Sequence, residues 1–132
     1  MKRVLFVCVE NACRSQMAEA FARRLGVGRF EAYSAGSRPA GGVNPRAAAF
    51  MAERGYDLSA HGSKPLSAFE GQSFDEVVTM GCGDACPWLP AARHVDWALP
   101  DPKALSDDEF RMVRDEIERR VQRLLLELEA AA

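Results

Sequence analysis

The sequence predicts an α/β fold in which a four-stranded parallel sheet is flanked by helices on both faces. Short apolar runs, typical of buried strands, alternate along the chain with segments of helical periodicity. The first run, Val4–Val7, is uninterrupted by polar residues, as in a parallel strand that is covered on both sides. Because ligands bind beyond the carboxyl ends of such strands, we expect a functional site in the loops at that edge of the sheet.

The first half of the chain supplies two strands and two helices. Apolar residues recur at helical spacing within Gln16–Leu25 and predict the first helix. The segment Phe30–Ala35 alternates in part between apolar and polar residues and predicts the second strand. The dipeptide Asn44–Pro45 combines residues typical of a helix N-cap and first turn, so a second helix is expected from there to about Arg54.

The second half supplies two more strands and a long helix. Phe74–Met80 predicts the third strand, and the alternation in Arg93–Trp97 predicts the fourth. A capping box formed by Ser106 and Glu109 begins the last helix. The apolar stripe expected along that helix consists of Phe110, Val113, Ile117, Val121, Leu124 and Leu128.

Length and composition indicate a single domain, residues 1–132. The net charge of −2 gives no general attraction to nucleic acid or to an anionic membrane. No apolar run approaches the roughly 20 residues of a membrane span, and the sequence contains no recognisable export signal, so we expect the chain in the cytoplasm. In the reducing cytoplasm, four cysteines point to catalysis or metal binding rather than to structural disulfides.

Eight residues, Cys8–Ser15, link the first strand to the first helix and predict a reaction centre. The unpaired amides of this loop and of the first helical turn suit a tetrahedral oxyanion, and the Arg14 guanidinium can bind two of its oxygens. The same field favours the thiolate form of Cys8, which places a nucleophile beneath the oxyanion. The alternative is a buried, unreactive Cys8 followed by a surface arginine. The residues expected to bind the oxyanion are Val9, Glu10, Asn11, Ala12, Cys13, Arg14 and Ser15.

A second pair of cysteines, Cys82 and Cys86, follows the third strand in a glycine-rich loop. Their spacing allows a disulfide. If the loop lies beside Cys8, the three thiols can form a relay in which each thiolate displaces sulfur or a sulfur-bound group. Two other interpretations remain open: a zinc site that includes His94 but lacks a fourth ligand at suitable spacing, and a pair of unreactive loop thiols.

Asp101 stands between Pro100 and Pro102 in the loop that follows the fourth strand. This position makes it a candidate general acid that protonates a leaving oxygen at the anion site. The alternative is a simple turn before the last helix.

Together these segments resemble the thioredoxin-coupled arsenate reductases, which share their fold with the low-molecular-weight protein tyrosine phosphatases. The resemblance spans nearly the whole chain. The cysteine pair after the third strand favours the reductases, because a hydrolase has no use for a thiol relay. The segments that carry the resemblance are Cys8–Glu19, Tyr33–Gly36, Val43–Pro45, Val77–Met80, Cys82 with Cys86–Pro87, Asp101–Pro102 and Val113–Ile117.

The resemblance implies that Cys8 attacks arsenate while Arg14 and the loop amides hold the oxyanion. Ser15 would donate a hydrogen bond to the thiolate, Asn11 would brace the loop, and Asp101 would protonate the departing oxygen. The activity implied is the reduction of arsenate to arsenite for arsenic detoxification.

The resemblance further implies that Cys82 attacks the Cys8–arsenic adduct, that arsenite leaves, and that Cys86 then forms a disulfide with Cys82. Reduced thioredoxin would donate the electrons that reopen this disulfide, with no cofactor bound to the chain. Phosphate and sulfate are expected analogues of arsenate, and the chain is expected to be a monomer. Cys13 receives no step.

Some members of the resembled family bind potassium near the anion loop through side chains that correspond to Asn11, Glu19 and Ser34. Lys64 stands where a further carboxylate is expected, and its amine would supply an internal cation. No metal site is therefore expected.

Three other functions are considered. The first is a low-molecular-weight protein tyrosine phosphatase in which Cys8, Arg14 and Asp101 form and hydrolyse a phosphoenzyme. The second is an arsenate reductase that uses a small thiol, glutathione or mycothiol, in place of thioredoxin. The third is an oxyanion or metal sensor without turnover. Weak phosphatase side activity is expected even of a reductase, because phosphate and arsenate are similar in shape and charge.

Overall fold

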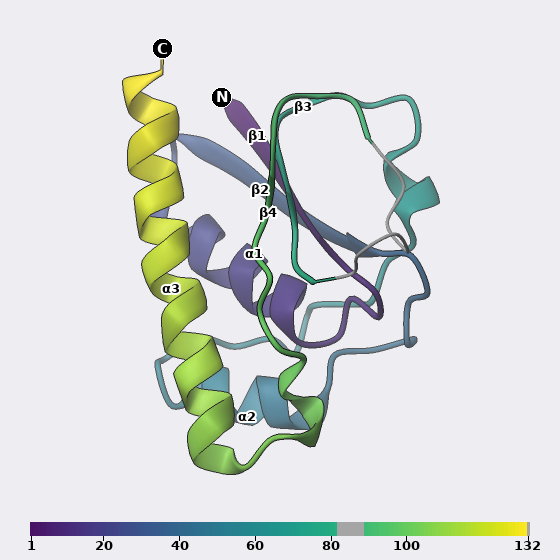
Figure 1. Ribbon diagram of the computed structural model, residues 1–132, viewed down its shortest axis with the longest axis vertical. Coiled ribbons are helices and arrows are strands. Elements are labelled where there is room, and N and C mark those ends of the chain that lie inside the picture. Colours follow the sequence, from purple (N-terminus) through teal and green to yellow (C-terminus); the bar gives the residue numbers. More distant parts are fainter. Residues whose placement is uncertain (82–88, 132) are drawn as a thin grey trace.

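The computed structural model describes residues 1–81 and 89–131 and contains one four-stranded parallel sheet beside three α-helices (Figure 1). Within the sheet, Cys8 lies opposite Gly36, so the carboxyl ends of neighbouring strands reach the same edge. The strands, in the spatial order β2-β1-β3-β4, are β1 (Lys2–Cys8), β2 (Phe30–Gly36), β3 (Phe74–Thr79) and β4 (Ala91–Asp96).

The α-helices are α1 (Arg14–Leu25), α2 (Pro45–Ala52) and α3 (Asp107–Ala130), and the short 3-10 helices are η1 (Leu66–Phe69) and η3 (Pro102–Ala104). The side chain of Asn44 caps α2, as predicted, by accepting a hydrogen bond from the Arg46 N–H. The predicted capping box of Ser106 and Glu109 is present at the start of α3. Helix α2 ends two residues before the predicted boundary, because the chain tightens there into a turn closed by Gly55 N–H and the Ala52 carbonyl.

The two faces of the sheet are covered unequally. All three α-helices contribute buried side chains to one core cluster, which includes Val4 and Phe6 of β1 and the whole predicted stripe of α3. The alternate residues Leu5 and Val7 face a smaller cluster that η1 covers through Phe69. The predicted parallel sheet with helices on both faces is therefore confirmed, with the longer helices gathered on one face.

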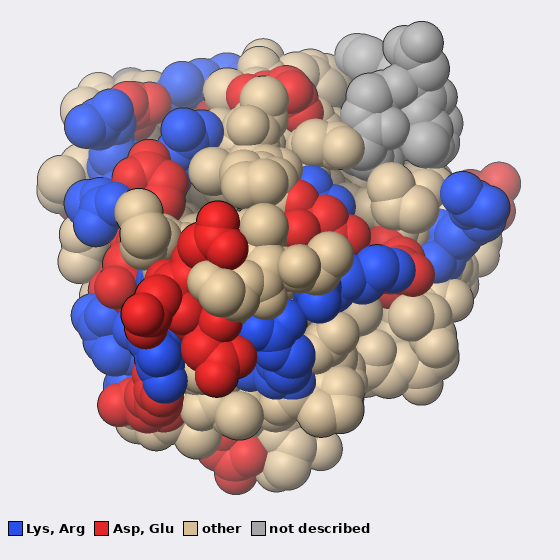
Figure 2. Space-filling model, turned by 60° about the horizontal axis from the view of Figure 1, so that its bottom comes forward, with Lys and Arg blue, Asp and Glu red and all other residues tan. Residues whose placement is uncertain are grey.

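Acidic and basic side chains are interspersed over the end of the molecule at which α2 and α3 begin (Figure 2). Ion pairs there include Arg46–Asp107, Arg111–Glu53 and Arg54–Asp115. Neither sign of charge covers this face alone. None of the helices within the described ranges combines the length and the apolar composition that a membrane span requires.

Candidate active site

The Cys8 thiol lies where β1 ends and faces the first turn of α1. It is 3% exposed, and its Sγ is 2.8 Å from the Ser15 hydroxyl. Helix α1 begins at Arg14 without a side-chain cap and without an acidic residue in its first turn, whereas α2 and α3 both begin with side-chain caps. The first amides of α1 are thus left for another acceptor, and the helix dipole favours an anion there.

Asn11 holds the loop between β1 and α1 in shape. It is fully buried, and its φ of 49° lies in the left-handed region that asparagine adopts more readily than most residues. Its Oδ1 accepts a hydrogen bond from the backbone N–H of Lys64 at 2.8 Å. Because that N–H can only donate, the amide orientation is fixed, and Nδ2 faces the Ser15 hydroxyl 2.7 Å away. Ser15 therefore accepts from Asn11 and keeps its own proton for Cys8.

Gln16 is a second brace that sequence reasoning missed. Its buried amide nitrogen donates to the Asn11 carbonyl oxygen at 3.1 Å and to the Gly62 carbonyl oxygen at 2.9 Å. These bonds tie the anion loop to a segment that is distant in the sequence. The one available signal was a polar residue beside Ser15, in a helical turn that otherwise begins the apolar core.

The Arg14 guanidinium is nearly buried and lies between the loop and the segment that follows β4. Its Nη1 donates to the Leu99 carbonyl oxygen at 2.9 Å, and its Nη2 is 3.9 Å from the Asp101 carboxylate. Gly81, with a φ of +79°, passes directly over it, and a β-carbon at this position would lie 2.7 Å from Nη1. Only glycine allows the chain that leaves β3 to approach Arg14 so closely.

Asp101 lies at the same cavity as Cys8. It caps η3 by accepting a hydrogen bond from the Lys103 N–H at 3.1 Å. The Lys103 amine in turn donates to the Glu10 carboxylate at 2.9 Å, a contact that sequence reasoning missed because 93 positions separate the two residues. The cavity is small, about 10 Å³, and is lined by Cys8, Glu10, Ala12, Cys13, Arg14 and Asp101.

Cys13 lies inside the loop as a protonated thiol. Burial raises its pKa to about 12, and the negative charge of Asp101 acts in the same direction. Among the described residues, Cys13 and Cys8 are both free cysteines. Cys13 therefore stays a weak nucleophile at neutral pH, which agrees with its having no expected step.

Comparison with known proteins decides the family. Residues 3–132 match the model of the low molecular weight phosphotyrosine protein phosphatase family. The chain belongs to this family. The glutaredoxin arsenate reductase of Synechocystis sp. is 40% identical over 131 residues, which cover 97% of this chain and 99% of that protein.

Solved structures extend the similarity to three dimensions. An arsenate reductase in its phosphate-binding state superposes with a TM-score of 0.88 at 41% identity, over 96% of this chain and 98% of that chain. The thioredoxin-dependent arsenate reductase of Corynebacterium glutamicum superposes with a TM-score of 0.81 at 34% identity, over 100% of this chain and 64% of that chain. The predicted resemblance to arsenate reductases of the low-molecular-weight phosphatase fold is confirmed.

A buried carboxylate lies behind the anion loop in this member of the phosphatase family. Glu19 has a side chain that is 3% exposed and accepts a hydrogen bond from the Ser34 hydroxyl. Arg23 lies 3.1 Å and Lys64 3.6 Å from its two oxygens. Lys64 thus lies where an internal cation was expected, and two side-chain cations already offset the charge of Glu19.

The proposed relay thiols lie outside the described residues. Cys82 and Cys86 fall within 82–88, so their distances from Cys8 and from His94 are not part of the geometry above. Within residues 1–81 and 89–131, no cluster of three His, Cys, Asp or Glu side chains is arranged to hold a metal ion. The relay and the zinc alternative therefore stay hypotheses that rest on the sequence.

Proposed function

We propose that this chain reduces arsenate to arsenite by a relay of three cysteines in the cytoplasm, as a step of arsenic detoxification. The observation that carries the proposal is the Cys8 thiol, held 2.8 Å from the Ser15 hydroxyl at the uncapped start of α1. This arrangement provides a nucleophile directly beneath an oxyanion site. Support for arsenate as the oxyanion comes from the Synechocystis relative, an arsenate reductase 40% identical over almost the whole chain.

In the first step the Cys8 thiolate attacks arsenic and forms an arsenic–sulfur bond. The bond from arsenic to the opposite oxygen breaks, and Asp101, which lines the same cavity, donates a proton so that this oxygen leaves as water. The loop amides and the Arg14 guanidinium bind the remaining oxygens and stabilise their negative charge. Ser15 donates its proton in a hydrogen bond to the Cys8 sulfur before the attack and whenever the thiolate is released.

The next steps move two electrons from sulfur to arsenic. The Cys82 thiolate attacks the Cys8 sulfur, a disulfide forms, and the electron pair of the broken arsenic–sulfur bond stays on arsenic, which leaves as arsenite. The Cys86 thiolate then attacks the Cys82 sulfur and frees the Cys8 thiolate. The position of the pair, which starts three residues after Thr79 at the end of β3, supports these steps.

A dithiol protein is the proposed electron donor, because the relay ends in a disulfide between Cys82 and Cys86. We favour reduced thioredoxin, on which the Corynebacterium glutamicum neighbour depends. The Synechocystis relative is named for glutaredoxin instead, so a glutathione-linked donor is the competing possibility. The requirement for Cys86 distinguishes the two donors. A thiol that attacks the adduct on Cys8 directly does not need Cys86, whereas reduction by thioredoxin does.

Hydrolysis of phosphate esters is the second candidate function, and the phosphatase family match favours it. The same three residues serve it: Cys8 forms a phosphoenzyme, Arg14 binds the phosphoryl oxygens and Asp101 protonates the leaving group. Neither Cys82 nor Cys86 takes part in such a reaction. Loss of the relay thiols therefore separates the two functions.

Three single variants, each assayed for arsenate reduction and for aryl phosphate hydrolysis, test the proposal. Cys8→Ser should abolish both activities, because an alcohol stays protonated at neutral pH. Cys82→Ser should abolish arsenate reduction and spare hydrolysis. Cys86→Ser should give at most one turnover with thioredoxin. Unchanged arsenate turnover in Cys82→Ser would refute the relay, and full turnover of Cys86→Ser with glutathione alone would replace thioredoxin by a small thiol.

A further inference from the structure

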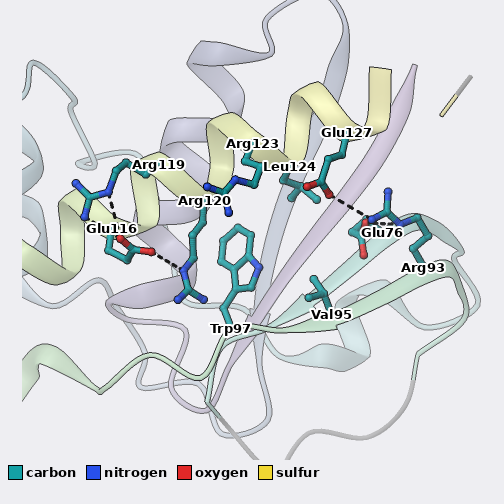
Figure 3. Close-up of a pocket in the computed structure, with 10 residues that line it drawn as sticks. All are labelled: Glu76, Arg93, Val95, Trp97, Glu116, Arg119, Arg120, Arg123, Leu124 and Glu127. Atoms are coloured by element: carbon teal, nitrogen blue, oxygen red, sulfur yellow. Dashed lines mark hydrogen bonds and ion pairs between the residues drawn. The ribbon is translucent and has the colours of Figure 1, made fainter. Parts of the chain in front are cut away.

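A cavity of about 360 Å³ lies between the edge strand β4 and helix α3 (Figure 3). It shares no lining residue with the cavity over Cys8. Its volume falls in the range of small-molecule sites, roughly 300–1,000 Å³. Nothing in the proposed reaction uses this cavity, and its charged lining is arranged unevenly.

At one end of the cavity, carboxylates outnumber the cations that could pair with them. The Glu76 side chain is 1% exposed, and neither of its oxygens has a hydrogen-bond donor among the described residues. Its charge partner is Arg93, whose Nε lies 3.3 Å away, and the same guanidinium also lies 3.4 Å from Glu127. Two carboxylates thus share one cation. A buried carboxylate without hydrogen bonds is costly, and a donor from outside would satisfy it.

At the other end of the cavity, arginines outnumber the carboxylates that could pair with them. Glu116 pairs through one oxygen with Arg119 and through the other with Arg120. The side chain of Arg123, on the next turn of α3, has neither a hydrogen bond nor an ion pair within the part of the chain that the structure describes. Figure 3 shows the two groups at opposite ends of the cavity. The excess of positive charge here is the counterpart of the excess of negative charge around Glu76.

The floor between the two ends is apolar. Trp97 and Val95 face the cavity from the strand side and Leu124 from α3 (Figure 3). The α3 residues 116, 120, 123 and 127 follow one another at helical spacing, so they form a single stripe along the cavity. Along that stripe Arg123 and Glu127 are separated by roughly 6 Å of helix axis. The charged ends are therefore within reach of one small molecule.

We propose that this cavity binds a small zwitterion, with a protonated amine or guanidinium at Glu76, a carboxylate at Arg120 and Arg123, and a short apolar chain over Trp97. Amino acids with extended side chains and short peptides belong to this class. An organic cation fits Glu76 better than a metal ion, because no group of three metal-ligating side chains occurs among the described residues. The proposal does not depend on the reaction at Cys8.

Isothermal titration calorimetry of the intact protein with ε-aminocaproate, a flexible zwitterion of suitable length, tests the proposal. Hexylamine and caproate, which each keep one of the two charges, serve as matched probes. We expect ε-aminocaproate to bind at least about tenfold more tightly than either, since each charge-assisted hydrogen bond contributes on the order of 1.5–3 kcal/mol. The Trp97 indole resonance should shift with the same saturation curve.

Two variants locate the charges, and a third controls for the loss of an arginine. Glu76→Gln and Arg123→Met should each raise the Kd of ε-aminocaproate about tenfold or more. Arg38→Met should leave it unchanged, because Arg38 is exposed and lies outside the cavity. If Glu76→Gln does not fold, Arg123→Met still tests the proposal, since it removes no side-chain hydrogen bond or ion pair within the described chain. Absence of saturable binding, a Kd unmoved by Arg123→Met, or resonance shifts confined to the Cys8 loop would overturn the proposal.

Discussion

Replacing Asn11 by alanine tests how the anion loop is held together. Asn11 is fully buried, and its side chain makes three hydrogen bonds: to the Ser15 hydroxyl, from the Lys64 N–H and from the Gln16 amide. Its φ of 49° adds a second requirement, because alanine is strained in the left-handed region. The substitution therefore removes three bonds and adds backbone strain in one step.

The expected loss of stability follows from these contacts. Each buried hydrogen bond contributes about 1 kcal/mol net, which gives about 3 kcal/mol for the three that Asn11 makes. Left-handed backbone costs alanine roughly 1 kcal/mol more. The free energy of unfolding should thus fall by about 4 kcal/mol, and Tm by about 15 °C for a domain of this size.

Urea unfolding of Asn11→Ala beside Asn11→Gly measures the two contributions separately. Glycine loses the same three hydrogen bonds but adopts a positive φ without strain. Asn11→Gly should therefore be more stable than Asn11→Ala by about 1 kcal/mol, the reverse of the usual order of these two residues.

Two results would show that Asn11 does not hold the loop in this way. A loss below about 1 kcal/mol in Asn11→Ala would mean that the buried bonds are replaced by water or by relaxation of the loop. Equal or greater stability of the alanine variant relative to the glycine variant would mean that the left-handed backbone is not required.

Three other predictions concern charge. Arg14→Lys should lower kcat/KM for aryl phosphate at least about 100-fold, because an ammonium cannot bind two oxygens in one plane; a loss below tenfold would contradict this. Hydrogen bonds, the strongest from Arg111, lower the pKa of Glu53 from 4.5 to about 2, so its stabilising effect is complete above pH 4.5 and is lost as the pH falls toward 2. Glu53→Gln should make Tm depend less on pH in that interval. If the decrease of Tm at low pH is the same in the variant, the hydrogen bonds to Glu53 do not stabilise the fold as described. Potassium chloride should raise Tm no more than sodium chloride at equal ionic strength, since the Lys64 amine lies 3.6 Å from the buried Glu19 carboxylate. A larger rise of Tm with potassium would show that the Lys64 amine does not take the place of a bound cation.

The strands, the helices and the anion loop were predictable because their signals are local. The apolar run of β1, the Asn44 cap and the Ser106 capping box depend on neighbours within a few residues. Cys8 and Arg14 were predicted as candidate site residues on the same kind of signal, their spacing in the strand–loop–helix segment. The sheet edge then brought Asp101 to the same cavity, as the rule for parallel sheets requires.

The contacts that complete the site were not predictable, because they join distant segments. The Leu99 carbonyl holds Arg14 across 85 positions, and a backbone oxygen has no sequence signature. Lys103 reaches Glu10 only because η3 turns back toward the anion loop. The requirement for glycine at position 81 arises from Arg14 beneath it, which a pattern of local residues cannot show.

The most direct test of the central claim is NADPH oxidation in the presence of thioredoxin and thioredoxin reductase, started by adding arsenate, with phosphate as the control. If the cysteine relay operates, NADPH oxidation is continuous, requires arsenate and does not occur with phosphate. Cys82→Ser then stops the oxidation. No arsenate-dependent oxidation with either thioredoxin or a glutathione-linked donor, together with brisk hydrolysis of an aryl phosphate by the same sample, would contradict arsenate reduction and indicate a phosphatase.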